Sequence, residues 1–225
     1  MLEKIERYFP EGIPFPSSRS YAYIAKRSPF LRDGYREVAR RVAEKLKQGR
    51  ILDVGTGPGY LPIEIARLIE GVEVVGIDVS EDMVRMARKS AWKEGLEGRV
   101  RFEVEDANSM SYGDSFFDLV VSTGSFHHWK KPVTVLNEIH RVLQPGCEAW
   151  IIDLRKEAPD DDREKLRKRY GRFMAWLFYR AVVIHSSTTR EELQRVLTEH
   201  ENRFKRYEIR EDYPLILVAV LFKNG

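Results

Sequence analysis

Short apolar runs alternate with amphipathic segments between residues 50 and 155. Runs with the length and composition of buried strands occupy residues 50–54, 72–77, 100–104, 116–122 and 148–153. Apolar side chains recur at the 3.6-residue period of a helix over residues 58–69, 80–93 and 132–143. This alternation is typical of βαβ units. It therefore predicts an α/β fold in which helices cover both faces of a mostly parallel, doubly wound sheet.

The segment before this stretch has a different pattern. Residues 35–47 carry Val38, Val42 and Leu46 at helical spacing, and Gly49 ends that predicted helix. The preceding residues include three prolines between positions 10 and 16, which indicate an irregular N-terminal segment.

The alternation of predicted strands and helices ends after residue 154. Three aspartates at 160–162 begin a charged helix that becomes aromatic and is expected to continue to about residue 183. Another helix is predicted near Thr188, where Thr188 and Glu191 fit a capping box. Two strand-like runs, 203–209 and 215–222, lie about five residues apart, which suits an antiparallel pair.

Composition and charge exclude several classes of protein. The 225 residues are 43% hydrophobic and 32% charged, as expected of a folded globular chain. The 38 basic and 35 acidic residues nearly balance, which argues against a dedicated nucleic-acid binder, and their abundance is typical of thermophiles. One cysteine excludes an internal disulfide framework. The longest apolar run is too short to span a bilayer and the N-terminus has no signal-peptide core, so we expect a cytoplasmic protein.

Glycines and three acids mark one end of the predicted sheet. Gly55, Gly57 and Gly59 follow a strand and open a helix, where glycine lets the backbone turn and approach a ligand closely. Asp53, Asp78 and Asp106 end or follow neighbouring strands, and the carboxyl ends of such strands form the ligand crevice of doubly wound sheets. Asp78 is placed to accept hydrogen bonds from ribose hydroxyls, and Asp106 from an adenine amine. An acid at position 53 favours a ligand with a positively charged head over a pyrophosphate. S-adenosylmethionine is a nucleoside of this kind.

An ordered set of motifs resembles the class I S-adenosylmethionine-dependent methyltransferases, and specifically the small-molecule branch that includes quinone-biosynthesis enzymes. The motifs are ILDVGTGPG at 51–59, VGIDVSEDM at 75–83, EDA at 105–107, SFFDLVVS at 115–122 and RVLQPG at 141–146. The resemblance implies a Rossmann-like sheet of seven strands in the order 3-2-1-4-5-7-6, with strand 7 antiparallel and a helical lid. We predict one domain over residues 1–225. Its parts are an N-terminal flap (1–34), a cofactor-binding core (35–155), a helical lid insertion (156–187), and a last helix with the antiparallel strand pair (188–225).

The resemblance also implies which residues contact the cofactor. It places Asp53, Gly55, Thr56 and Gly57 at the methionine part and Asp78 at the ribose. The remaining implied contacts are Val79, Met83, Asp106 and Ala107 around the adenine, and Ser122 or Thr123 near the sulfonium. Met83 also fits a helical apolar pattern, so core packing is an alternative role for it.

Two adjacent histidines follow the fourth predicted strand. Either His127 or His128 is a candidate general base, because histidine exchanges protons near neutral pH. The alternative is that they only shape the pocket. They lack further ligands at metal-binding spacing, so no metal site is predicted.

Aromatic residues suggest where a substrate would bind. Phe126 and Trp129 flank the two histidines, and Tyr21 and Tyr23 lie in the N-terminal segment. The expected aromatic helix, with Tyr179 and Arg180 near its end, would line a hydrophobic substrate pocket, form a homodimer contact or lie on a membrane surface.

These features predict an enzyme that transfers a methyl group from S-adenosylmethionine to a small, apolar or aromatic metabolite. Three alternatives stay open at this stage. A dinucleotide-dependent oxidoreductase is disfavoured by Asp53, and an RNA methyltransferase by the lack of a basic stripe with interleaved aromatics. A non-catalytic partner that keeps the cofactor site has no sequence feature against it.

Overall fold

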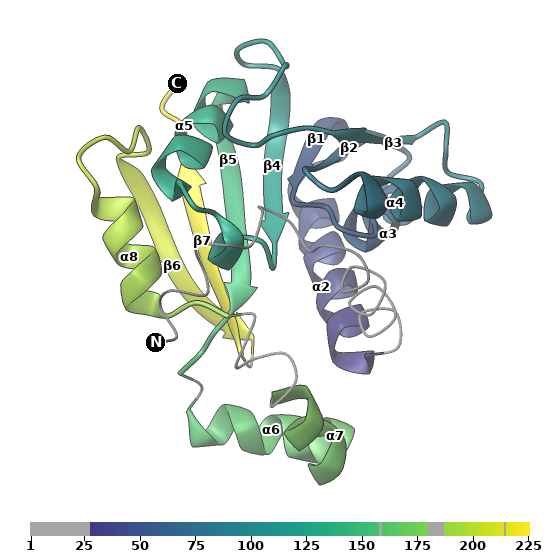
Figure 1. Ribbon diagram of the computed structural model, residues 1–225, viewed down its shortest axis with the longest axis vertical. Helices are drawn as coiled ribbons and strands as arrows, with labels where there is room; N and C mark the ends of the chain where they lie inside the picture. The colour runs from purple at the N-terminus through teal and green to yellow at the C-terminus, as the bar shows by residue number, and fades with distance from the viewer. Residues whose placement is uncertain (1–27, 158, 180–186, 214) are drawn as a thin grey trace.

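The computed structural model describes residues 28–157, 159–179, 187–213 and 215–225. Seven strands form one sheet in the order β3-β2-β1-β4-β5-β7-β6 (Figure 1). They are β1 (Gln48–Val54), β2 (Gly71–Asp78), β3 (Val100–Val104), β4 (Phe117–Thr123), β5 (Leu143–Leu154), β6 (Arg206–Tyr213) and β7 (Ile216–Phe222). Strands β1 to β5 pair in parallel, and β7 is antiparallel to both of its neighbours. The predicted strand order and the antiparallel seventh strand are confirmed.

Helices pack on both faces of this sheet because neighbouring strand residues point to opposite sides. On one face, residues such as Ile51 and Val74 pack against α2 (Pro29–Lys45), α3 (Tyr60–Leu68) and α4 (Glu81–Lys93). On the other, Leu52 and Val75 belong to a core shared with α5 (Pro132–Val142) and α8 (Arg190–Thr198). Both cores consist of almost fully buried apolar side chains, most of them aliphatic, so the sheet is a rigid platform for its loops.

Two helix starts differ from the sequence prediction. Helix α2 begins at Pro29, capped by the Ser28 hydroxyl, so the end of the expected flap is helical. The predicted capping box at Thr188 is wrong by one residue, because Thr189 is the N-cap and Glu192 its partner. Thr188 is instead paired with Arg155 in an isolated bridge, and its N–H donates to the carbonyl of Leu154 at 2.9 Å. This extended pairing ties the chain to the end of β5 before α8 begins.

The predicted aromatic helix is broken. Gly171 separates α6 (Asp160–Tyr170) from α7 (Arg172–Phe178). Its backbone, at φ +83° and ψ 152°, has a conformation that essentially only glycine adopts, and it ends one helix and turns the chain into the next. Both helices lie beyond the carboxyl ends of β4 and β5 (Figure 1). They pack through Leu166, Ala175 and Phe178 onto Phe30 of α2. Tyr21, Tyr23, Arg180 and residues 180–183 of the expected helix lie outside the described residues. Among the described helices, none has both the length and the apolar character needed to cross a bilayer.

Candidate functional site

The loop after β1 is built by glycines with positive φ. Gly55 has φ +73° and Gly57 has φ +52°, and the N–H groups of Gly55 and Thr56 both donate to the carbonyl of Ile77 at 2.9 Å. A Cβ on Gly55 would stand 2.5 Å from the Cβ of Ser125, so only glycine fits there. A Cβ on Gly57 would meet no atom within 4 Å. Gly57 lines a cavity, so its bare backbone leaves room for a ligand to approach.

Two of the predicted acids lie on either side of this loop. Asp53 is 2% exposed, and burial, aided by the nearby charge of Asp78, raises its pKa to about 7. The Asp78 carboxylate accepts one N–H on each oxygen, from Gly57 and from Ser80, both at 2.9 Å. Burial raises the pKa of Asp78 as well. The two carboxylates thus form an environment in which a positive charge is favourable.

A cavity of about 950 Å³, counted with its opening, lies at the carboxyl ends of β1, β2 and β4. It brings together most of the predicted cofactor residues, namely Asp53, Gly55, Thr56, Gly57, Asp78, Val79, Met83, Asp106, Ala107 and Thr123. His128 and Trp129 also line it. Tyr35 and Glu105 line it too, and neither was among the predicted site residues.

The remaining predicted site residues lie elsewhere. Ser122 is fully buried, and its hydroxyl lies 2.6 Å from that of Ser125 beneath the cavity floor. Phe126 packs in the core at 5.4 Å between ring centroids from Trp129. The Tyr179 hydroxyl accepts a hydrogen bond from Arg163 on α6. Ser122, Phe126 and Tyr179 therefore do not line this cavity, nor do they line the neighbouring cavity described next.

A second cavity, of about 620 Å³ counted with its opening, shares Tyr35, Thr123, Gly124 and His128 with the first. The rest of its lining is mostly apolar: Phe30, Leu31, Gly34, Val38, His127, Ile152, Asp153, Leu154 and Ile216. A small molecule in this cavity would therefore lie directly beside a ligand in the first.

His127 is held by a buried carboxylate in the wall of the second cavity. Its Nδ1 lies 2.9 Å and 3.1 Å from the two carboxylate oxygens of Asp153, and its backbone N–H donates to the same group at 3.2 Å. Leu154 contributes a further N–H to Asp153 at 2.7 Å. The Nε2 atom of His127 is buried and has no hydrogen-bond partner among the described residues. Asp153 therefore orients the His127 ring so that Nε2 is left to act as a general base.

The neighbouring histidine has a different character. Burial, and next the proximity of His127, lowers the pKa of His128 to about 4. His128 is therefore neutral near pH 7 and adds no positive charge to the wall between the cavities. Sequence reasoning missed Asp153, although an acid inside the apolar run IIDL was a signal that could have found it.

The first cavity fits S-adenosylmethionine by the chemistry of its groups. The acids provide acceptors for hydroxyls and for a cationic head, Gly57 leaves backbone space, and Val79 and Met83 provide apolar walls. No cluster of three metal-ligating side chains occurs within the described ranges. The sheet order and this site define the class I S-adenosylmethionine-dependent methyltransferase fold.

The comparison with protein families gives the same class. The profile of a methyltransferase domain family, Methyltransf_31, matches residues 45–202, and the chain belongs to that family. This membership confirms the predicted resemblance to class I methyltransferases.

Individual relatives agree with this assignment. The chain is 33% identical over 121 residues to a demethylmenaquinone methyltransferase of Porphyromonas gingivalis. The matched region covers 53% of this chain and 49% of that protein. The chain spans about half the length of the curated relatives it matches first. A proposed S-adenosyl-L-methionine-dependent methyltransferase from Methanococcus maripaludis superposes with a TM-score of 0.72 at 22% identity, covering 96% of this chain and 98% of the other. The plantazolicin methyltransferase BpumL, solved with SAH and a triazolic desmethylPZN analog, has a TM-score of 0.66 at 21% identity over 94% of this chain and 92% of that chain. At these identities the two structures establish the fold.

Proposed function

We propose that the protein transfers a methyl group from S-adenosylmethionine to a hydroxyl of a small, apolar or aromatic metabolite. The observation that carries the proposal is the shared wall between the two cavities. Thr123, Gly124 and His128 line both, so cofactor and acceptor would meet at these residues. The demethylmenaquinone methyltransferase relative acts, by its name, on a quinone-type molecule, which agrees with a mostly apolar acceptor cavity.

The cofactor, when bound, supplies a methyl group that its sulfonium already activates. The protein then has to bind, orient and exclude water. Asp53 would hold the positively charged methionine part, and Asp78 the ribose hydroxyls. The neutral His128 in the shared wall avoids placing a second positive charge near the sulfonium.

His127 would accept the proton of the acceptor hydroxyl on Nε2, since Nδ1 is engaged by Asp153. As the hydroxyl oxygen takes the methyl group, the methyl–sulfur bond would break, its electron pair would stay on the sulfur of S-adenosylhomocysteine, and the hydroxyl proton would pass to the imidazole of His127. The buried carboxylate of Asp153 stabilises the resulting imidazolium. Methylation of a neutral amine would not require such a base in the same way, which favours an oxygen acceptor.

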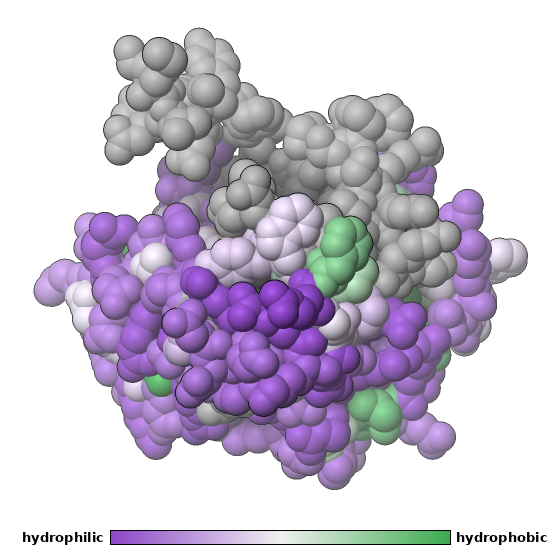
Figure 2. Space-filling model, turned by 90° about the horizontal axis from the view of Figure 1, so that it is seen from below, coloured by the Kyte–Doolittle hydropathy of each residue, from purple (hydrophilic) through white to green (hydrophobic). Residues whose placement is uncertain are grey.

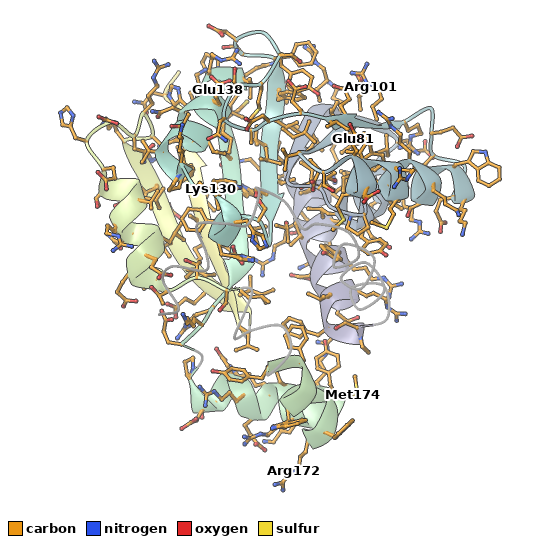
Figure 3. The ribbon with its side chains drawn as sticks, in the orientation of Figure 1. Glu81, Arg101, Lys130, Glu138, Arg172 and Met174 are labelled. Carbon is orange, nitrogen blue, oxygen red and sulfur yellow. The ribbon has the colours of Figure 1, made fainter. Side chains whose placement is uncertain are left out.

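Isothermal calorimetry tests cofactor binding. Wild-type protein is expected to bind S-adenosylmethionine with a micromolar Kd, and Asp78→Ala to weaken binding by about a hundredfold. Loss of charged hydrogen bonds costs about 1.5–3 kcal/mol each. Glu81→Gln is a matched control, because it removes an exposed acidic charge from the first turn of α4 (labelled in Figure 3) without touching the cavity lining. Absence of binding by the intact protein would refute the proposal.

A turnover screen tests the acceptor. The protein is incubated with S-adenosylmethionine and a library of phenols, hydroquinones, aliphatic alcohols and amines, and release of S-adenosylhomocysteine is measured. Turnover concentrated among apolar hydroxyl compounds supports the proposal. Turnover only with amines would contradict the assigned role of His127, and cofactor binding without any turnover would favour a non-catalytic partner.

A further inference from the structure

Helix α7 exposes large apolar side chains on the side that faces away from the sheet. Phe173 is 70% exposed, Trp176 57% and Met174 42%, and the rings of Phe173 and Trp176 stack with their centroids 6.2 Å apart. The opposite side of the helix is buried through Ala175 and Phe178. A short helix that is apolar on both sides has one face without a packing partner among the described residues, which indicates an interaction surface.

This apolar patch of Phe173, Met174 and Trp176 lies beside a cluster of basic residues. Residues 165–179 contain no acid and five basic residues, Lys165, Arg167, Lys168, Arg169 and Arg172. Three of these five are paired with acids, Lys165 with Asp162, Arg167 with Glu164 and Arg169 with Asp33. Within the described parts of the chain, Lys168 and Arg172 form no ion pair. Figure 2 shows apolar surface next to strongly hydrophilic surface at this end of the molecule. In Figure 3 the Arg172 side chain points away from the sheet at the lower tip.

We propose that α7 and the basic end of α6 dock on an anionic lipid surface. Aromatic rings at the level of the headgroups and lysine or arginine beside them are the features that bind such surfaces. The charges disfavour a second copy of this chain as the occupant. A symmetric dimer through the patch would bring the unpaired Lys168 and Arg172 of the two copies close to each other.

The buried side of α7 connects the patch to the second cavity. Phe178 contacts Phe30 at 4.3 Å between ring centroids, and Phe30 lines that cavity. Docking would therefore hold the cavity close to the lipid. If the proposed function is right, this arrangement suits an apolar acceptor that resides in the bilayer, although the docking itself does not depend on that function.

Co-sedimentation with vesicles tests the docking. The full chain is expected to bind vesicles of phosphatidylglycerol and phosphatidylcholine at least tenfold more tightly than vesicles of phosphatidylcholine alone. The double variant Phe173→Ser, Trp176→Ser should weaken vesicle binding by at least about a hundredfold, because each ring removed from the lipid costs at least about tenfold. The double variant Lys168→Gln, Arg172→Gln should lose about fivefold for each charge removed. Trp92→Ser is the matched control, since Trp92 is 68% exposed on α4, and it should bind as the wild type does.

Three outcomes would overturn the docking proposal. These are no binding to anionic vesicles, equal binding by the α7 variants, and a dimer that forms without lipid and disappears in the Phe173→Ser, Trp176→Ser variant by light scattering. Calorimetry with S-adenosylmethionine on the same variants separates this proposal from the previous one. Retained cofactor binding shows that the variants are folded. Absence of cofactor binding in every protein, with vesicle binding intact, would refute the methyltransferase proposal alone.

Discussion

Asp53 is expected to destabilise the ligand-free protein at neutral and alkaline pH. The side chain is 2% exposed, and burial together with the charge of Asp78 raises its pKa from 3.8 to about 7. Asp53→Asn keeps the shape of the side chain and removes its charge. We therefore expect the variant to be more stable than the wild type without ligand, at the expense of cofactor binding.

The direction of this pH dependence follows from the number of protons that Asp53 binds in the folded and in the unfolded protein. Between pH 3.8 and about 7 the unfolded chain has lost the Asp53 proton while the folded chain still holds it. The free energy of unfolding of the wild type therefore falls as the pH rises through this window. A change of this size in pKa corresponds to about 4 kcal/mol when complete, at about 1.4 kcal/mol per pH unit. Between pH 5 and pH 8 the loss should be about 2–3 kcal/mol.

Urea unfolding at several pH values between 5 and 8 measures this effect. The free energy of unfolding of Asp53→Asn, minus that of the wild type, should increase by about 2–3 kcal/mol as the pH rises from 5 to 8. Taking the difference between the two proteins cancels groups such as His128, whose lowered pKa makes stability rise with pH instead. Glu97→Gln changes an exposed acid, so its free energy of unfolding should vary with pH in the same way as that of the wild type. If the difference in free energy of unfolding between Asp53→Asn and wild type does not change with pH, the pKa of Asp53 is not raised by burial and the reasoning is refuted.

Two further predictions concern the loop and the proposed base. Gly55→Ala should cost about 2 kcal/mol or more in urea unfolding, because the new Cβ would meet Ser125 at 2.5 Å in a left-handed backbone, whereas Gly57→Ala should cost about 1 kcal/mol and mainly obstruct the cofactor; equal losses would contradict the assigned close contact. With an acceptor from the screen, His127→Gln should lower kcat by about 10²–10⁴-fold and Asp153→Asn by at least tenfold, with the Kd for S-adenosylmethionine unchanged. Unaltered kcat in both variants would leave these residues a structural role.

Local sequence patterns determined most of the sheet and the cofactor end of the site. The strand at 100–104 was predicted with its observed bounds, and the others within a few residues except β5, whose observed start is five residues earlier. Apolar runs specify buried parallel strands because both faces of the sheet are covered. The loop at 53–57 and Asp78 meet in one cavity because parallel strands end at the same edge. The order of the strands, and the cofactor contacts beyond the glycine loop and the three acids, needed the family resemblance in addition.

Only the tertiary structure decided the acceptor side of the molecule. His127 and Asp153 are 26 residues apart, and their contact exists because β5 pairs beside β4 and ends where the 3₁₀ turn after β4 begins. Nothing local in the sequence distinguishes His127, with its carboxylate partner, from His128, which is neutral through burial. The second cavity is likewise assembled from α2, β4, β5 and β7, elements far apart along the chain. The period of apolar side chains along a segment predicts which face of a helix or strand is buried. The polar groups that contact a buried polar side chain are determined by how the elements pack in the tertiary structure.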